Sequence, residues 1–172
     1  MCPDEVMFSA SVRAEQARHG SREAYARRAA KGGFALDLSD EAIAFIAARN
    51  SGYLSTASAD GQPYVQHRGG PAGFIAVLDR RTVAFAEYPG NRQFISSGNL
   101  AENARAFLLL MDYANGRRLK LWGSARMVAN RELLDRMIAP DGVKVEHAIM
   151  FAIHAIDWNC SKHIPKLVPQ TP

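Results

Sequence analysis

The sequence predicts a mainly β chain of the α+β class, an antiparallel barrel or sandwich with peripheral helices. From Gly52 onward, short apolar runs alternate with turn residues, which is typical of antiparallel sheet. Asp60-Gly61 separates two such runs, and Asp-Gly in that position is among the strongest hairpin signals. Counted along the chain, the runs give roughly seven strands in mostly antiparallel order, which suits a small barrel or sandwich.

The chain before Gly52 is predicted to be helical. Residues 9–30 are rich in Ala, Arg, Glu and Gln and are divided by Gly20-Ser21, so we expect two short helices. A third helix follows Ser39, a good N-cap residue, and should end near Asn50.

The elements after residue 50 are predicted from apolar runs and the turn residues between them. They are strands over 53–58 and 63–68, a second hairpin over 74–78 and 82–87, a helix over 91–103 broken near Gly98-Asn99, strands over 104–113 and 119–128, a short helix over 131–138 and a final strand over 148–156.

The length of the chain fits one domain. At 172 residues it can bury a proper core but is short for two ordinary domains. We expect a helical extension over residues 1–50, packed on the barrel, and the barrel domain itself over residues 51–172.

Composition excludes several classes of partner. Hydrophobic residues make up 48% and charged residues 22%, yet no apolar run is long enough for a membrane helix and no export signal is visible, so we expect a cytoplasmic chain with no membrane partner. The net charge is +4, but Glu15 and Glu23 interrupt the basic residues between Arg13 and Lys31, as on a solvated helix face. We therefore expect no nucleic-acid partner.

The reactive side chains fit neither a metal centre nor a disulfide framework. Cys2 and Cys160 lie at opposite ends of the chain, and the histidines are scattered, so we expect reduced thiols and no metal. Nucleophile elbows, Walker loops and His-Glu-x-x-His patterns are missing from the sequence, which gives no support to hydrolase or nucleotide-triphosphatase activity.

One polar cluster follows Pro89-Gly90. Asn91 can cap a helix whose first N–H groups have no intrahelical partner, and Arg92 lies beside that terminus. Such a terminus with an adjacent guanidinium binds anions such as phosphate. The alternative is that Arg92 only covers a helix end in solvent.

A second polar cluster is formed by Gln66, His67 and Arg68, consecutive in a predicted strand. Consecutive strand residues point to both faces of a sheet, so some of these polar atoms should be buried and need partners. If that partner is a ligand, Gly69-Gly70 lets it approach the backbone closely. Alternatively, Gln66 and Arg68 are exposed, His67 is satisfied internally and the glycines form a turn.

Taken together, these segments resemble the pyridoxamine 5′-phosphate oxidase-related family, whose members are FMN-binding split-barrel flavoproteins. The resemblance covers most of the chain after the N-terminal helices. It is carried by residues 53–57 (YLSTA), 60–71 (DGQPYVQHRGGP), 88–93 (YPGNRQ), 98–100 (GNL), 119–123 (LKLWG) and 157–160 (DWNC).

The resemblance implies an antiparallel split β-barrel with FMN as cofactor and assigns each polar cluster a role. The flavin ring lies along Gln66, His67, Arg68 and Gly69, where a cation such as Arg68 would raise the reduction potential. Asn91, Arg92 and Gln93 then hold the phosphate.

Two departures from the oxidase itself remove one positive charge from the phosphate site and leave the substrate open, respectively. Gln93 stands where the oxidase tends to have lysine, and residues 159–166 replace its arginine-containing C-terminal segment. The polar finish over 158–163 is either a docking tail or a segment that closes over the site.

The resemblance further implies a homodimer with flavin at the interface, for which the apolar run 107–111 and the strand around 120–123 are suited. We therefore expect an FMN-dependent oxidoreductase acting on a small-molecule redox substrate. A non-enzymatic sensor or carrier of flavin or another small ligand is the alternative, and haem or a deazaflavin in the same barrel is a third possibility.

Overall fold

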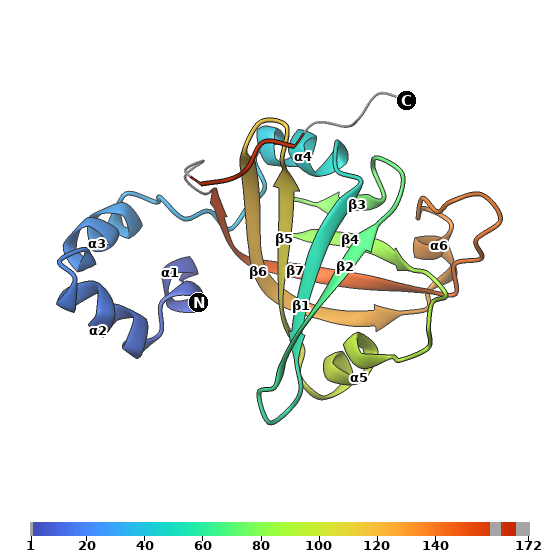
Figure 1. The fold of residues 1–172 in the computed structure, drawn as a ribbon, viewed down its shortest axis with the longest axis horizontal. Coiled ribbons are helices and arrows are strands. Elements are labelled where there is room, and N and C mark those ends of the chain that lie inside the picture. The colour runs from blue at the N-terminus through green and yellow to red at the C-terminus, as the bar shows by residue number, and fades with distance from the viewer. Residues whose placement is uncertain (1, 159–162, 168–172) are drawn as a thin grey trace.

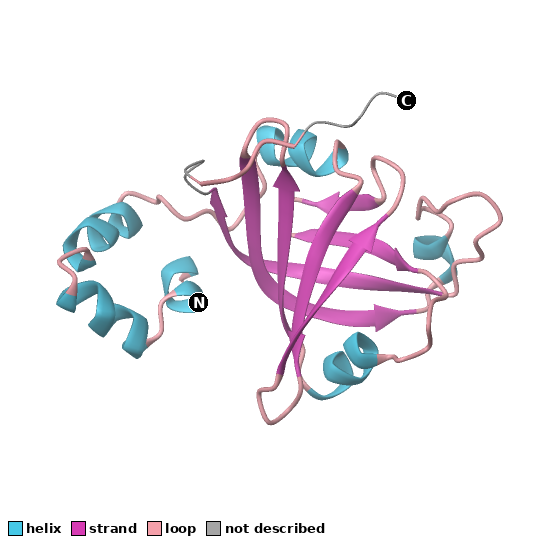
Figure 2. Ribbon diagram, viewed as in Figure 1, coloured by secondary structure: helices cyan, strands magenta, loops and turns pink. Residues whose placement is uncertain are grey.

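The computed structural model describes residues 2–158 and 163–167, and their fold is an antiparallel sheet that curls into a partly open barrel (Figures 1 and 2). Within the described residues the sheet has seven strands in the order β2-β1-β5-β6-β7-β4-β3. The predicted mainly β split barrel with peripheral helices is confirmed. The strands are β1 Ser51–Ala57, β2 Pro63–Gly69, β3 Ile75–Asp79, β4 Thr82–Glu87, β5 Arg105–Asp112, β6 Arg117–Val128 and β7 His147–Trp158.

Two hairpins, two long strands and strand β5, which lies between β1 and β6, build this sheet. β1 pairs with β2 across Asp60-Gly61, as the sequence predicts, and β3 pairs with β4. β6 and β7 are 12 residues each and are paired along most of their length, with a shift in register between Trp122 and Gly123. Because β2 and β3 have a neighbour on one side only, the barrel stays open between the two ends of the sheet.

The core lies inside the curled sheet, and alternating residues of each strand point into it. Seven of its largest fully buried side chains are Leu54, Phe85, Leu108, Leu110, Leu119, Leu121 and Phe151.

Helix α4, Asp40–Ala47, belongs to this core. Ser39 is its N-cap, as predicted, and the Ser39 hydroxyl accepts a hydrogen bond from the Ala42 N–H at 3.2 Å. Phe45 and Ile46 are buried in the cluster that fills the barrel. α4 therefore covers one end of the barrel (Figure 1).

The N-terminal helices α1 (Pro3–Met7), α2 (Ala10–Arg18) and α3 (Arg22–Ala30) lie beside the barrel (Figures 1 and 2). The last two match the predicted pair, while α1 was not predicted. Phe8 packs edge-on against Phe34 at a centroid distance of 5.5 Å, and an Arg28 guanidinium nitrogen lies 2.6 Å from an Asp157 carboxylate oxygen. The division at residue 50 stays a prediction.

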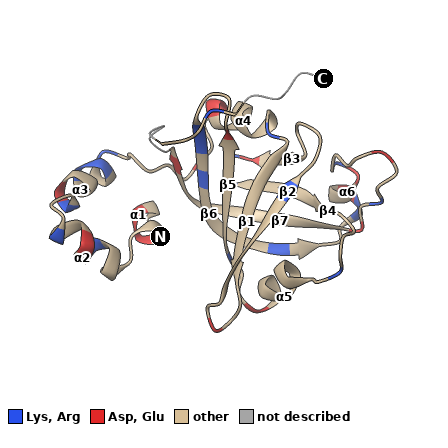
Figure 3. Cartoon of the chain, in the orientation of Figure 1, with Lys and Arg blue, Asp and Glu red and all other residues tan. Residues whose placement is uncertain are grey.

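Acidic and basic side chains are interspersed on these helices (Figure 3). Arg18 pairs with Glu15 at 2.6 Å and Arg27 with Glu23 at 3.4 Å, each within one helix. Such exposed pairs are typical of a solvated helix face. Among the described residues, no helix combines the length and apolar character needed to cross a membrane.

The predicted helix over 91–103 is wrong in its start and in its break. Helix α5 runs from Ile95 to Glu102 without interruption. It cannot begin at Asn91, because Arg92 and Phe94 have φ of +60° and +52°, outside the right-handed helical region. Helix α6, Arg131–Leu134, is also shorter than the predicted 131–138.

Two glycines should respond to alanine substitution in opposite directions. At Gly123 a Cβ would collide with the Ala152 carbonyl oxygen and lie 2.5 Å from the Phe151 ring, whereas nothing lies within 4 Å of one at Gly98 in α5. We expect Gly123→Ala to lower the free energy of unfolding by about 1–3 kcal/mol or more. Gly98→Ala should raise it by about 0.5–1 kcal/mol, because alanine is the better helix former.

Urea unfolding followed by circular dichroism measures both changes. Equal stability of Gly123→Ala and the wild type would contradict the close β6–β7 packing. A destabilised Gly98→Ala would contradict an unbroken α5.

Candidate functional site

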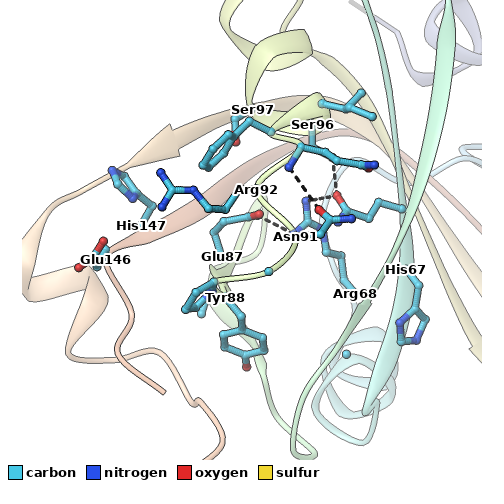
Figure 4. A pocket seen from close by; sticks show the side chains of 18 of the residues that line it. His67, Arg68, Glu87, Tyr88, Asn91, Arg92, Ser96, Ser97, Glu146 and His147 are labelled. Carbon is cyan, nitrogen blue, oxygen red and sulfur yellow. Dashed lines mark hydrogen bonds and ion pairs between the residues drawn. The ribbon is translucent and has the colours of Figure 1, made fainter. Parts of the chain in front are cut away.

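A cavity of about 700 Å³ lies where edge strand β2 faces the end of β4, the loop into α5 and the start of β7 (Figure 4). Pockets for small ligands and cofactors typically have volumes of about 300–1,000 Å³. Both polar clusters identified in the sequence contribute to its lining, and every predicted site residue lies there: Gln66, His67, Arg68, Gly69, Asn91, Arg92 and Gln93.

Strand β2 divides its polar residues between its two faces, as its period of two requires. Arg68 is buried with 8% of its surface exposed, whereas His67 and Val65 are exposed. The His67 ring packs edge-on against Tyr53 at 5.7 Å and points away from the Arg68 side chain (Figure 4). Gln66 and Arg68 therefore form the inner polar group, and His67 lies at the margin.

The Arg68 guanidinium is the centre of a buried polar cluster. One of its nitrogens donates to a Glu87 carboxylate oxygen at 2.6 Å and another to the Gln66 side-chain oxygen at 2.9 Å. The Ser96 hydroxyl donates to the same Gln66 oxygen at 2.8 Å. Within the part of the chain that the structure describes, the buried Arg68 Nε–H has no hydrogen-bond partner.

The loop before α5 forms another wall of the cavity. Asn91 is not the helix cap: its side-chain oxygen accepts the Gln93 N–H at 3.2 Å. The N-cap is Phe94, whose side chain offers no acceptor, so no side chain caps the first N–H groups of α5. Arg92 is exposed at this loop and forms no ion pair with the described residues. Its guanidinium carbon lies 5.9 Å from the centre of the Phe94 ring.

Gly70 has a different role from the predicted one. A Cβ on Gly70 would lie 2.6 Å from the Phe74 Cβ and 2.8 Å from the Tyr88 hydroxyl oxygen. The space beside this glycine is therefore filled by protein side chains rather than left open for a ligand. Tyr88 donates to the Ile138 carbonyl oxygen at 2.9 Å, and burial raises its pKa above the ordinary value.

Comparison with protein families then gives a clear match: the family described as pyridoxamine 5′-phosphate oxidase matches residues 38–166. The chain belongs to the pyridoxamine 5′-phosphate oxidase family. The match includes α4, the whole sheet and every predicted site residue, while α1, α2 and α3 lie outside it.

Solved structures share this fold at low sequence identity. An FMN-binding protein from Syntrophomonas wolfei is 14% identical with a TM-score of 0.52, over 66% of this chain and 80% of that one. HupZ from Group A Streptococcus is 15% identical with a TM-score of 0.53, over 69% and 91%. An F420 reductase is 20% identical with a TM-score of 0.50, over 70% and 98%. No curated protein is significantly similar to the chain.

In this family member, two residues of the polar cluster had no predicted role. Glu87 is the last residue of β4, and Ser96 lies in the first turn of α5. Both contact residues far away in sequence, Arg68 and Gln66, so no local pattern marks them. The only signal was Glu87 itself, a charged residue that ends an apolar strand next to a predicted ligand site.

The C-terminal residues 158–163 were predicted to be either a docking tail or a segment that closes over the site. Of residues 158–163, only Trp158 and His163 are among the described residues. Trp158 packs edge-on against Phe45 of α4 at 5.0 Å. Among the described residues, no three His, Cys, Asp or Glu side chains lie close enough together to hold a metal ion.

The hydrogen bond from Ser96 to Gln66 can be tested against its neighbour in the same helix. Ser96→Ala removes a buried donor to Gln66 and should lower the free energy of unfolding by about 1 kcal/mol. Ser97→Ala is the control, because the Ser97 hydroxyl has only the weak Met127 sulfur acceptor at 3.8 Å. Its effect should stay within about 0.5 kcal/mol. Equal effects of the two variants in urea unfolding would remove Ser96 from the cluster.

Proposed function

We propose that the chain is an FMN-dependent oxidoreductase acting on a small-molecule redox substrate, with the flavin held in the cavity between β2, β4 and α5. The observation that carries this proposal is that, in a member of the pyridoxamine 5′-phosphate oxidase family, one cavity joins the exposed Arg92 and the uncapped start of α5 to the polar cluster around the buried Arg68. The fold shared with an FMN-binding protein adds support.

The anion-binding end fits the phosphate of FMN. The first N–H groups of α5 carry partial positive charge and lack a side-chain cap, and the Arg92 guanidinium lies at the same loop. Asn91 and Gln93 complete the loop as neutral hydrogen-bonding side chains, so Arg92 supplies its only full positive charge over residues 89–94. Arg92 would therefore be the main phosphate-binding side chain.

The buried end fits the flavin ring. The Arg68 Nε–H is a donor still without a partner among the described residues, and Gln66 has a side-chain amide group beside it. A ring carbonyl or nitrogen would satisfy that donor, which removes the cost of burying it unpaired. Gln66 and Arg68 would thus orient the ring, while Phe74 and Tyr88 exclude water from the cavity wall.

Bound FMN would supply the electron and hydride chemistry, which needs no acid or base from the protein. The chain's own residues then bind, orient and shield the ring. The sequence names no substrate, and the exposed position of the Arg92 loop leaves an open side through which a small molecule can enter.

A homodimer is part of the proposal. Opposite the core, the outer face of β2, β1, β5 and β6 carries apolar side chains that include Val65, with 59% of its surface exposed. Tyr53 lies opposite Leu109, and the Phe107 and Trp122 rings pack edge-on at 4.9 Å. A second copy of the chain would cover this face, because apolar side chains gathered on the exposed face of a sheet are typical of an interface.

The visible spectrum separates the proposed function from its rivals. We expect purified protein, or protein incubated with excess FMN, to show a flavin spectrum and to oxidise NADH or NADPH in the steady state. A flavin spectrum without turnover would instead identify a sensor or carrier. Because the fold is also that of an F420 reductase, a spectrum of bound deazaflavin is the other outcome to examine. A chain that stays colourless with excess FMN would contradict the proposal.

Arg92→Ala tests the phosphate end. Loss of a charge-assisted hydrogen bond to phosphate should weaken FMN binding by about 1.5–3 kcal/mol, measured by fluorescence quenching. Alanine retains a Cβ, so the left-handed backbone at this position is equally strained in both proteins. Arg131→Ala, which removes an arginine side chain that is 89% exposed on α6, is the control and should bind FMN as the wild type does. Unchanged affinity in Arg92→Ala would remove Arg92 from the site.

Leu109→Glu tests the dimer. A carboxylate on the outer face should convert the dimer to monomer, because removing it from water at the interface is costly even though Lys120 is its cross-strand neighbour. Gln62→Glu adds the same charge on the exposed β1–β2 turn and should stay dimeric. Sedimentation velocity measures the oligomeric state. A monomeric wild type, or a dimeric Leu109→Glu variant, would contradict this interface.

A further inference from the structure

The pair formed by Arg68 and Glu87 connects parts of the sheet that are not neighbours. Arg68 lies on edge strand β2, while Glu87 ends β4 near the other end of the strand order. Their closest nitrogen and oxygen are 2.6 Å apart, with 9% of the Arg68 side chain and 25% of the Glu87 side chain exposed. The carboxylate thus holds the guanidinium in place beside the cavity (Figure 4).

This pair changes the charge at the buried end of the cavity. An unpaired Arg68 would present a full positive charge there, as expected from the sequence. With Glu87 at 2.6 Å the two formal charges cancel, and only the dipole of the Arg68 Nε–H still lacks a partner among the described residues. The cavity therefore has a net cation at the Arg92 loop and a neutral ion pair at its buried end.

The charge of a flavin ring depends on its redox state. The oxidised ring is neutral, and uptake of two electrons and one proton leaves the reduced ring with one negative charge. A free cation beside the ring favours the reduced anion, whereas a neutralised one favours it much less. The charge of Glu87 can therefore change the reduction potential by neutralising the charge of Arg68.

We propose that Glu87 is a positioning residue that lowers the reduction potential of the bound flavin by neutralising Arg68, and so makes the pocket prefer the oxidised, neutral ring. This rests on the proposed FMN binding. A lowered potential makes the reduced flavin a stronger electron donor, which suits a reaction in which a small-molecule acceptor is reduced. Glu87 itself contacts Arg68 rather than the reacting atoms.

Glu87→Gln is the decisive variant, because the amide keeps the size of the side chain and can still accept a hydrogen bond from Arg68. We expect it to bind reduced FMN about tenfold more tightly, relative to oxidised FMN, than the wild type does. For a two-electron couple, this tenfold change is a potential about 30 mV higher. A spectroelectrochemical titration of the holoprotein measures the shift.

Two further variants separate charge from shape. Glu87→Asp keeps the negative charge. Its affinity for reduced relative to oxidised FMN should therefore stay within about threefold of the wild-type value, even if the shorter side chain lowers stability. Glu146→Gln removes a carboxylate from the same cavity, but one that is 64% exposed and paired with Lys144 at 3.0 Å. It should leave the potential unchanged, because solvent screens that charge.

The outcomes are distinct. FMN uptake with equal potentials in the wild type and Glu87→Gln overturns the role of Glu87 and leaves the proposed function standing. An equal shift in Glu146→Gln also overturns it, because the effect would then follow net charge rather than the Arg68–Glu87 pair. Failure of the wild type to take up FMN overturns the proposed function and this inference together.

Discussion

The ion pair between the buried Arg68 and the half-buried Glu87 is the constraint on which the cavity depends. A charged group removed from water is costly unless a partner of opposite charge lies close by, so each side chain fixes the position of the other. The partners lie far apart in the strand order, and the pair therefore sets the distance between β2 and the end of β4. The hydrogen bond from Ser96 to Gln66 attaches α5 to the same strand. Together these contacts fix the width of the barrel's open side, where the cavity lies.

Much of the fold could be predicted because its signals are local. Asp60-Gly61 between alternating runs predicts the β1–β2 hairpin, and Ser39 marks the start of α4. The start of α5 could not be predicted, because it depends on left-handed backbone at Arg92 and Phe94, residue types that rarely adopt it. The nearby Gly90, which could adopt that conformation without strain, does not have a positive φ.

That these residues lie together at one cavity could be predicted, but their contacts could be predicted only in part. Strand alternation predicted that some of the polar atoms of Gln66, His67 and Arg68 would be buried, and the Pro-Gly corner placed Arg92 beside a helix terminus. Neither step required long-range information. The partner of Arg68 could not be predicted in this way, because Glu87 is 19 residues away and lies on a strand that does not neighbour β2. The prediction for Gly70 was wrong for the same reason: the side chains that fill its space come from elsewhere in the fold.

Strand β2 connects the two surfaces that the proposed function requires. Its inner face carries Arg68, and its outer face carries Val65 and His67, which lie opposite Ser55 and Tyr53 of β1. As an edge strand it has a backbone partner on one side only, so its position is fixed chiefly by β1 and by the contacts of these two faces. A second copy of the chain packed on Val65 would immobilise β2 and, with it, the Arg68 guanidinium. Dimerisation and cofactor binding would then stabilise each other. Either event would order β2, and the other event would then lose less conformational entropy.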